Sequence, residues 1–322
     1  MKKHKKFILN IFLSLIGITI IYTFLIFNYY TTIELLWVNS LKEKKDTYAA
    51  AEDEIKIIFT SGSNTLFGVR TSNITEELGV PTYNLAIHAA LGVDFILEEA
   101  KEVLRSGDTV IIPMEYSILM SDESSNKLAF DYYRLFDNNN LNRINSLDRI
   151  RFILQNSPIN ALEHTALALQ VKDVTEVSYK SSYVNGNGDQ TKHYEFSEEL
   201  LRNVEPIKLP DEMKETVGLK KIKEFNVWCN ENNITFYFMY PSTILFDEYY
   251  QKPYTNYFNF LESYFTKNNV SVIGSPYDSF YDISLFHDTN YHLNEKGMTI
   301  RTEYIAKQLN ALKEKEAASK GH

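Results

Sequence analysis

The most constraining feature of this sequence is an uninterrupted apolar stretch near its start. Residues 7–30 carry no charged side chain and follow the basic segment MKKHKK at 1–6. About 20 apolar residues in a helix cross a hydrocarbon core of about 30 Å. A cleavable signal peptide begins in the same way, but its apolar region spans about 7 to 15 residues and ends at small residues, which Phe27-Asn28-Tyr29-Tyr30 does not supply. The sequence therefore predicts an uncleaved, single-pass transmembrane helix.

The charge distribution predicts how this helix is oriented. The basic residues of the N-terminus precede the span, whereas the chain as a whole has a net charge of -9. The positive-inside rule then places residues 1–6 in the cytoplasm and the body outside the membrane. An acidic body repels phosphate backbones, so we expect no nucleic-acid partner. Cys229 is the sole cysteine, which excludes an intrachain disulfide.

The remaining chain has the pattern of an α/β domain. We predict a charged linker at 31–54 and a domain at 55–322, in which short apolar strands alternate with helices and form a parallel sheet covered on both faces. A polar segment at about 117–210 interrupts the alternation, and we interpret it as an insertion over the carboxyl edge of the sheet. The predicted strands are 55–60, 82–86, 109–114, 234–240 and 270–273, and the predicted helices are 95–105, 213–232, 254–267 and 294–315.

Two distant segments carry residues suited to nucleophilic catalysis. Ser63 follows the first predicted strand, at the sheet edge where α/β folds place their sites, although a serine there is also a common helix cap. Asp288 and His292 precede the last predicted helix, where a carboxylate can hold a histidine in the tautomer that accepts a serine proton. The alternative is a surface-loop histidine beside a turn-capping aspartate, and His287 is a rival base. His4, His164, His193 and His322 lack metal-ligand spacing and Cys229 lies on an apolar helical face, so we expect no metal and no other cofactor.

These segments resemble motifs of the SGNH, or GDSL-type, hydrolases. Ser61-Gly62-Ser63 resembles the family's Gly-Asp-Ser block, and Asp288 to His292 resembles its Asp-x-x-His block with one extra residue. Residues 84–89 match the second block loosely, with alanines at both glycine positions. The resemblance implies a flavodoxin-like sheet and a triad of Ser63, His292 and Asp288.

The resemblance is incomplete at the site that stabilises the oxyanion. The family uses backbone N–H groups of its first two blocks, here those of Ser63 and Ala89, together with an asparagine side chain of a third block. This chain has Glu115-Tyr116 where that block is expected. An ionised carboxylate cannot donate a hydrogen bond, so we expect either that Asn64, Tyr116 or a partner subunit substitutes or that the protein alone is slow. Glu115 orients an arginine or a sugar hydroxyl, or it is a solvated carboxylate.

A membrane-anchored subset of the family is similar in its overall plan. Its members work with membrane-bound O-acyltransferases in teichoic acid D-alanylation and exopolysaccharide O-acetylation. The resemblance implies O-acyl transfer, in particular of acetyl groups, through Ser63 to a cell-surface or secreted polysaccharide, with a membrane-bound O-acyltransferase as partner. The alternatives are a carbohydrate esterase with the same triad and a catalytically silent glycan-binding accessory.

Overall fold

The computed structural model describes residues 2–123, 125–170 and 179–320. The chain divides into two compact units, which we call the anchor unit and the sheet unit. The anchor unit comprises residues 1–39 and 127–178, and the sheet unit comprises residues 40–126 and 179–322. Each unit is thus assembled from segments that lie far apart in the sequence.

A five-stranded parallel sheet organises the sheet unit, in the order β2-β1-β3-β4-β6. This confirms the α/β fold and the parallel sheet predicted from the alternation of strands and helices. Because the chain runs from β1 to β2 and then returns to the other side of β1, the order reverses between β1 and β3, the position at which open α/β sheets bind ligands. The strands are β1 (Ile57–Phe59), β2 (Thr82–Asn84), β3 (Thr109–Pro113), β4 (Thr235–Met239) and β6 (Val272–Ile273).

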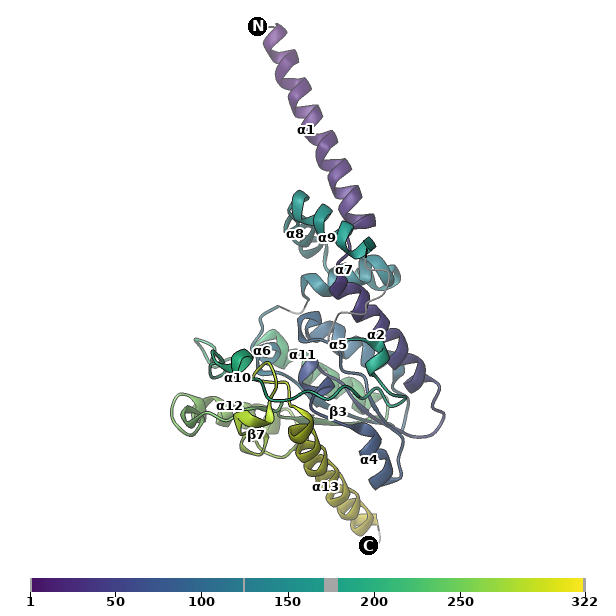
Figure 1. The fold of residues 1–322 in the computed structure, drawn as a ribbon, viewed down its shortest axis with the longest axis vertical. Helices are drawn as coiled ribbons and strands as arrows, with labels where there is room; N and C mark the ends of the chain where they lie inside the picture. Colours follow the sequence, from purple (N-terminus) through teal and green to yellow (C-terminus); the bar gives the residue numbers. More distant parts are fainter. Residues whose placement is uncertain (1, 124, 171–178, 321–322) are drawn as a thin grey trace. The chain divides into compact units, whose positions relative to one another are not determined.

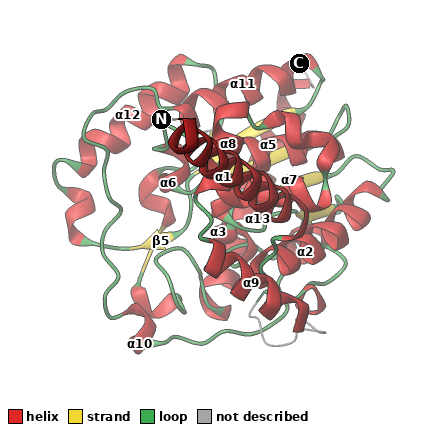
Figure 2. Cartoon of the chain, turned by 90° about the horizontal axis from the view of Figure 1, so that it is seen from above, coloured by secondary structure: helices red, strands yellow, loops and turns green. Residues whose placement is uncertain are grey.

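Helices pack on both faces of this sheet, and the strands appear in yellow among them in Figure 2. In β1, Ile58 joins one apolar cluster while Ile57 and Phe59 join the opposite one, as the two-residue period of a strand requires. The first cluster includes residues of α5 (Gly92–Val103), α6 (Tyr116–Leu119), α11 (Val217–Glu231) and α12 (Tyr254–Lys267). The second includes residues of α4 (Thr71–Leu78) and α13 (Glu295–Lys320). Shorter elements of this unit are α3 (Ser63–Leu66), α10 (Glu198–Leu201) and the two-stranded parallel sheet of β5 (Thr243–Ile244) and β7 (Phe280–Tyr281).

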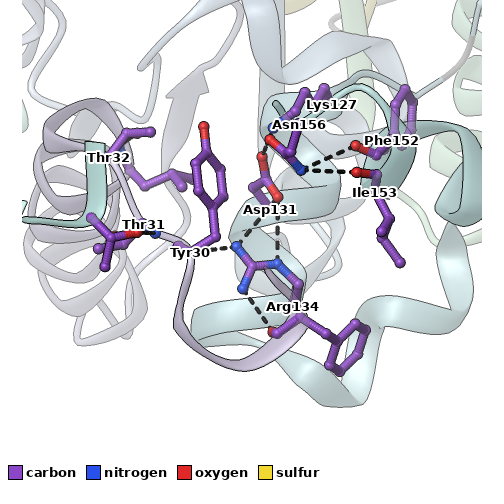
Figure 3. A network of polar contacts seen from close by, with 12 residues as sticks. Tyr30, Thr31, Thr32, Lys127, Asp131, Arg134, Phe152, Ile153 and Asn156 are labelled. Atoms are coloured by element: carbon purple, nitrogen blue, oxygen red, sulfur yellow. Dashed lines mark hydrogen bonds and ion pairs between the residues drawn. The ribbon is translucent and has the colours of Figure 1, made fainter. Parts of the chain in front are cut away.

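The anchor unit is built around α1 (Lys2–Tyr29), which is long and apolar enough to be a membrane span or a signal sequence. Three helices of the predicted insertion, α7 (Lys127–Phe136), α8 (Ser146–Leu154) and α9 (Pro158–Gln170), contact the carboxyl-terminal part of α1 (Figure 1). Arg134 of α7 donates hydrogen bonds to the carbonyl oxygens of Phe27 and Tyr30, at 2.7 and 2.6 Å, and pairs with Asp131 (Figure 3). A cation on the last carbonyls of a helix stabilises the negative end of its dipole, so α7 is held to the end of α1.

Two segments differ from the sequence-based prediction. Much of the predicted linker forms a helix, α2 (Ile33–Ala50), whose buried residues Leu35, Val38, Leu41, Lys45 and Ala49 follow a helical period. The predicted insertion is divided between the units instead of forming one layer over the sheet edge. Its turn at 185–189 belongs to the sheet unit, where Asp189 accepts hydrogen bonds from Thr71 and Ser72 at the start of α4.

Candidate active site

Ser63, His292 and Asp288 form a hydrogen-bonded chain in the sheet unit. His292 Nε2 lies 2.8 Å from Ser63 Oγ, and His292 Nδ1 lies 2.8 Å from Asp288 Oδ1. Because a carboxylate only accepts, Nδ1 carries the proton toward Asp288 and Nε2 is left to accept the serine proton. The structure therefore contains the contacts among Ser63, His292 and Asp288 that the sequence predicts. His287, the rival base, does not occupy the position next to Ser63.

The loop that carries the histidine is closed at its base, which brings Asp288 and His292 together despite their four-residue spacing. Phe286 and Leu293 form an antiparallel bridge, and the His287 N–H donates to the His292 carbonyl at 3.1 Å. The residues between are confined to a tight loop, in which the side chains of Asp288 and His292 meet. A spacing of four residues thus produces the same couple as the three-residue spacing of the motif it resembles.

Gly62 sets the shape of the turn that presents Ser63. This turn joins β1 to the single-turn helix α3, which begins at Ser63. A Cβ placed on Gly62 would lie 2.3 Å from Glu115 Oε1 and 2.7 Å from the Cα of Ala89. Both distances are too short for non-bonded atoms, so only glycine permits this close approach of the Ser63 turn to Glu115 and Ala89.

Glu115 holds this turn from the neighbouring strand. It follows β3, is 2% exposed, and accepts hydrogen bonds from the N–H groups of Gly62 and Asn64, at 3.2 and 3.1 Å. Its Oε2 also lies 2.9 Å from Ser61 Oγ, whose single proton goes either to this carboxylate or to the Pro113 carbonyl. The expectation of a solvated carboxylate, or of one that orients an arginine, is therefore wrong: Glu115 is buried and binds the two residues on either side of Ser63.

Two backbone N–H groups near the serine turn are candidate oxyanion donors. Within the described part of the chain, the N–H groups of Ser63 and Ala89 have no hydrogen-bond acceptor. Ala89 begins a 3₁₀ turn against Gly62, so the second-block donor predicted from the sequence does lie beside the serine turn. Neither group is therefore engaged by another described part of the chain, and Ala89 lies against the turn that carries Ser63.

Of the two side chains proposed to replace the missing asparagine, Asn64 is hydrogen-bonded within the turn, whereas the buried Tyr116 hydroxyl has no hydrogen-bond partner in the described part of the chain. The Asn64 amide donates to Ser61 Oγ at 2.9 Å and to the Pro113 carbonyl at 2.8 Å. Tyr116 is fully buried in the apolar cluster that includes α12, and its ring packs against Tyr257 and Phe258 of that helix. In this conformation neither side chain supplies a third oxyanion donor.

The Asp288 carboxylate contacts both histidines of the loop. Its Oδ1 lies 3.1 Å from His287 Nε2 as well as 2.8 Å from His292 Nδ1. Partial burial raises the pKa of Asp288, but the hydrogen bonds from His287 and His292 outweigh that effect and hold the pKa well below its usual range. The carboxylate therefore stays ionised in the pH range of folded proteins. His287, His292 and Asp288 are also close enough to share a metal ion, although their facing atoms already bind one another.

Aromatic side chains pack around the histidines. The Phe67 ring lies 4.6 Å from the His292 ring and 5.2 Å from the His287 ring, measured between centroids. Tyr194 stacks on His287 at 4.5 Å, and its pKa is raised to about 12 by burial and by the charge of Asp288. These rings fix the orientation of both imidazoles. This packing could not be predicted from the sequence, because Phe67, Tyr194 and the histidines lie far apart along the chain.

Two cavities border the site residues. One of about 400 Å³ is lined by the segment 206–210 and by Asn290 and Tyr291, which lie between Asp288 and His292 in the sequence. The other, of about 220 Å³, is lined by Ala89 on the side of the second candidate oxyanion donor. Ser117 of α6 lines both cavities. Space for ligands is therefore present next to the histidine loop and next to Ala89.

No protein-family model matches the chain, and no curated protein matches it. The resemblance to SGNH hydrolases accordingly rests on the short motifs and on the arrangement of the residues themselves.

Proposed function

We propose that this protein is a serine-dependent O-acyltransferase that acetylates hydroxyl groups of a cell-surface or secreted polysaccharide. The observation that carries the proposal is the chain of two 2.8 Å contacts from Ser63 through His292 to Asp288. A serine, an imidazole and an ionised carboxylate in this order constitute the machinery of nucleophilic acyl transfer. The position of Ser63 after β1, beside the point where the strand order reverses, agrees with an SGNH-like, flavodoxin-like fold.

The geometry supports a two-step reaction. In the first step His292 Nε2 takes the Ser63 proton as Oγ attacks the acyl carbonyl of the donor, and the same proton then passes to the leaving group. The acyl group is left as an ester on Ser63. In the second step a glycan hydroxyl loses its proton to His292 Nε2, attacks this ester and releases Ser63 as its proton returns. The N–H groups of Ser63 and Ala89 stabilise the negative oxygen in both steps.

The proposal includes a location and a partner. Helix α1 anchors the chain as a single-pass membrane protein, with residues 1–6 in the cytoplasm and the sheet unit outside the membrane. A membrane-bound O-acyltransferase supplies the acyl group from the other side of the membrane, and the polysaccharide is the acceptor. The cavity of about 400 Å³ lined by Asn290 and Tyr291, in the loop that also carries His292, has room for a sugar ring.

Intact-mass analysis tests the covalent step. The full chain, purified in detergent, is incubated with an activated acetyl ester, and we expect the gain of one acetyl group on Ser63. Ser63→Ala and His292→Ala should each abolish the gain to a similar, non-additive extent, because the residues act as a unit. Ser157→Ala, at an exposed serine of the anchor unit, is the matched control and should acetylate normally. Acetylation of the Ser63→Ala protein at the same rate would reject the acyl-enzyme.

A cellular measurement separates transfer from hydrolysis. A strain carrying Ser63→Ala should still make the polysaccharide but lack its acetyl groups, because polymerisation is a separate reaction. More acetyl groups than in the parent strain would instead identify an esterase, which removes them through the same triad. Unchanged acetylation with normal protein levels would reject both activities and favour the glycan-binding accessory.

A further inference from the structure

The anchor unit exposes an apolar surface in addition to the span itself. Large aliphatic side chains that are between 56% and 80% exposed project from α8 and α9. Monomeric soluble proteins rarely expose such side chains in a cluster, and clusters of this kind mark membrane or protein contacts. The residues are Leu147, Ile150 and Leu154 of α8 and Ile159 and Leu162 of α9.

Two contacts fix the level of α9 along α1. The Tyr22 hydroxyl donates to the Asn156 carbonyl, and the Thr31 N–H donates to Thr165 Oγ1 at 3.4 Å. Both pairs are 134 residues apart in the sequence, so α9 runs beside α1 in the same direction over about 13 Å. The turn between α8 and α9 therefore lies at the level of Tyr22, and the end of this stretch lies at the level of Thr31.

This register places the turn inside the hydrocarbon. If the core begins at Phe7, directly after the last lysine, then about 20 residues of helix carry the chain across it and its outer boundary lies near Ile26. Tyr22 is four residues below that boundary, or about 6 Å at 1.5 Å per residue. Amphipathic helices that lie in a membrane surface are buried to a depth of about 5 to 10 Å.

The exposed polar residues at the turn, Gln155 and Ser157, are uncharged, and the exposed charged residue of α9 and one charged pair of α8 fit the same placement. Glu163 and His164 are exposed but neighbour Thr165, at the level of Thr31 outside the span. Arg151 pairs with Asp148 at 3.4 Å, and a long arginine side chain can direct its charge toward the lipid headgroups. A cavity of about 360 Å³ between α1 and α9, bordered by Ile18, Ile21, Leu25 and Leu162, is lined by apolar side chains. Water has few hydrogen-bond partners in it, whereas an acyl chain fits its chemistry.

We propose that α8 and α9 form a wedge, residues 146–166, that inserts into the outer leaflet of the membrane beside α1. Acyl chains of outer-leaflet lipids cover Leu154 and Ile159 beside the turn and enter the cavity between α1 and α9. The occupant is lipid because Leu154 and Ile159 lie beside the turn at the level of Tyr22, within the membrane span proposed for α1, on which this inference rests.

Spin labels in vesicles test this insertion without any requirement for activity. The full chain is reconstituted in phosphatidylcholine–phosphatidylglycerol vesicles with a nitroxide on a cysteine introduced by Leu154→Cys or Ile159→Cys. The native Cys229 is fully buried and does not compete for the label. Leu200→Cys, at a 60% exposed leucine of the sheet unit, is the matched control.

We expect collisions with oxygen, relative to those with a water-soluble nickel chelate, to be severalfold more frequent at positions 154 and 159 than at position 200. Equal accessibility to the nickel chelate at all three positions would overturn the proposal, since the wedge would then lie in water. Protection of positions 154 and 159 from both reagents would also overturn it, because it would indicate contact with a second protein chain. Circular dichroism of each labelled protein verifies that it is folded.

Discussion

Glu115 offers the sharpest test of how the serine turn is positioned. Its carboxylate accepts the N–H groups of Gly62 and Asn64, which flank Ser63, and one of its oxygens also faces Ser61 Oγ. Glu115→Gln preserves the size of the side chain but replaces one acceptor oxygen with an NH₂ donor. If the remaining oxygen faces Gly62, the new NH₂ group faces the Asn64 N–H, and two donors meet without an acceptor.

The expected losses of stability and of acylation rate in Glu115→Gln follow from that single unsatisfied contact. A buried donor left without its acceptor costs about 1 to 3 kcal/mol. We expect the free energy of unfolding to fall by that amount, and the rate of Ser63 acylation to fall by about 10- to 100-fold if the same contact is needed in the transition state. Removal of the negative charge near the oxyanion acts in the opposite direction, since the charge of Glu115 disfavours a second negative charge nearby.

The assay follows the acylation of Ser63 by an activated acetyl ester, together with urea unfolding of the same protein. Glu199→Gln, which makes the same exchange at an exposed site, is the control and should match the parent in both measurements. An acylation rate that rises in Glu115→Gln would refute the positioning role and show that charge repulsion dominates. A large loss of stability with unchanged acylation would restrict Glu115 to folding.

The remaining predictions concern the histidine loop and a buried lysine. Asp288→Asn should lower the acylation rate by about 10⁴-fold, the loss found when the carboxylate that fixes the tautomer of a triad histidine is removed. His287→Gln should lower the rate much less, because His287 does not contact Ser63. Equal losses in the His287 and His292 variants would identify the two histidines as equivalent. Treatment with a chelator should leave acylation unchanged, because Asp288 Oδ1 already binds both imidazoles, and loss of activity that Zn²⁺ restores would reveal a metal site. Burial lowers the pKa of Lys45 to about 7, whereas a lysine in the unfolded chain has a pKa of ~10.4. Between these two pH values the folded state binds fewer protons than the unfolded state. The free energy of unfolding should therefore rise with pH across that window. Lys45→Met should flatten this rise in urea titrations, and an unaltered pH profile would show that Lys45 is not its source.

Much of the sheet unit could be predicted from the sequence because its strands are short apolar runs that end in turns. The predicted strand 109–114 became β3 (Thr109–Pro113), and the predicted helix 254–267 became α12 with the same bounds. Helix α2 was missed for a physical reason. Its buried face includes Lys45, which donates to the Ala86 carbonyl, so the apolar period is interrupted by a charge and the segment resembles a solvated linker.

The partners of the site residues were less predictable than their identity. Ser63 and the Asp288–His292 pair could be found because their motifs are local and the triad needs only three residue types. The role of Glu115 depends on a contact across 51 to 54 residues of sequence, and the division of residues 117–210 between two units depends on packing against α1. Such long-range contacts leave no periodic signal in the chain.

Under the proposed function, the lack of a third oxyanion donor favours transfer over rapid hydrolysis. With only the N–H groups of Ser63 and Ala89 as donors, the loss of the third typically slows acyl transfer by about 10² to 10³. In an esterase that meets its substrate by diffusion, this loss lowers the rate of every turnover. For an enzyme anchored beside its acyl donor the cost matters less, because tethering raises the effective concentration of the reactants, to the millimolar range for short linkers. The anchor and the incomplete oxyanion site are thus consistent with each other, and together they predict that removal of α1 lowers acyl transfer to polysaccharide in cells far more than it lowers acetylation of Ser63 by a soluble ester.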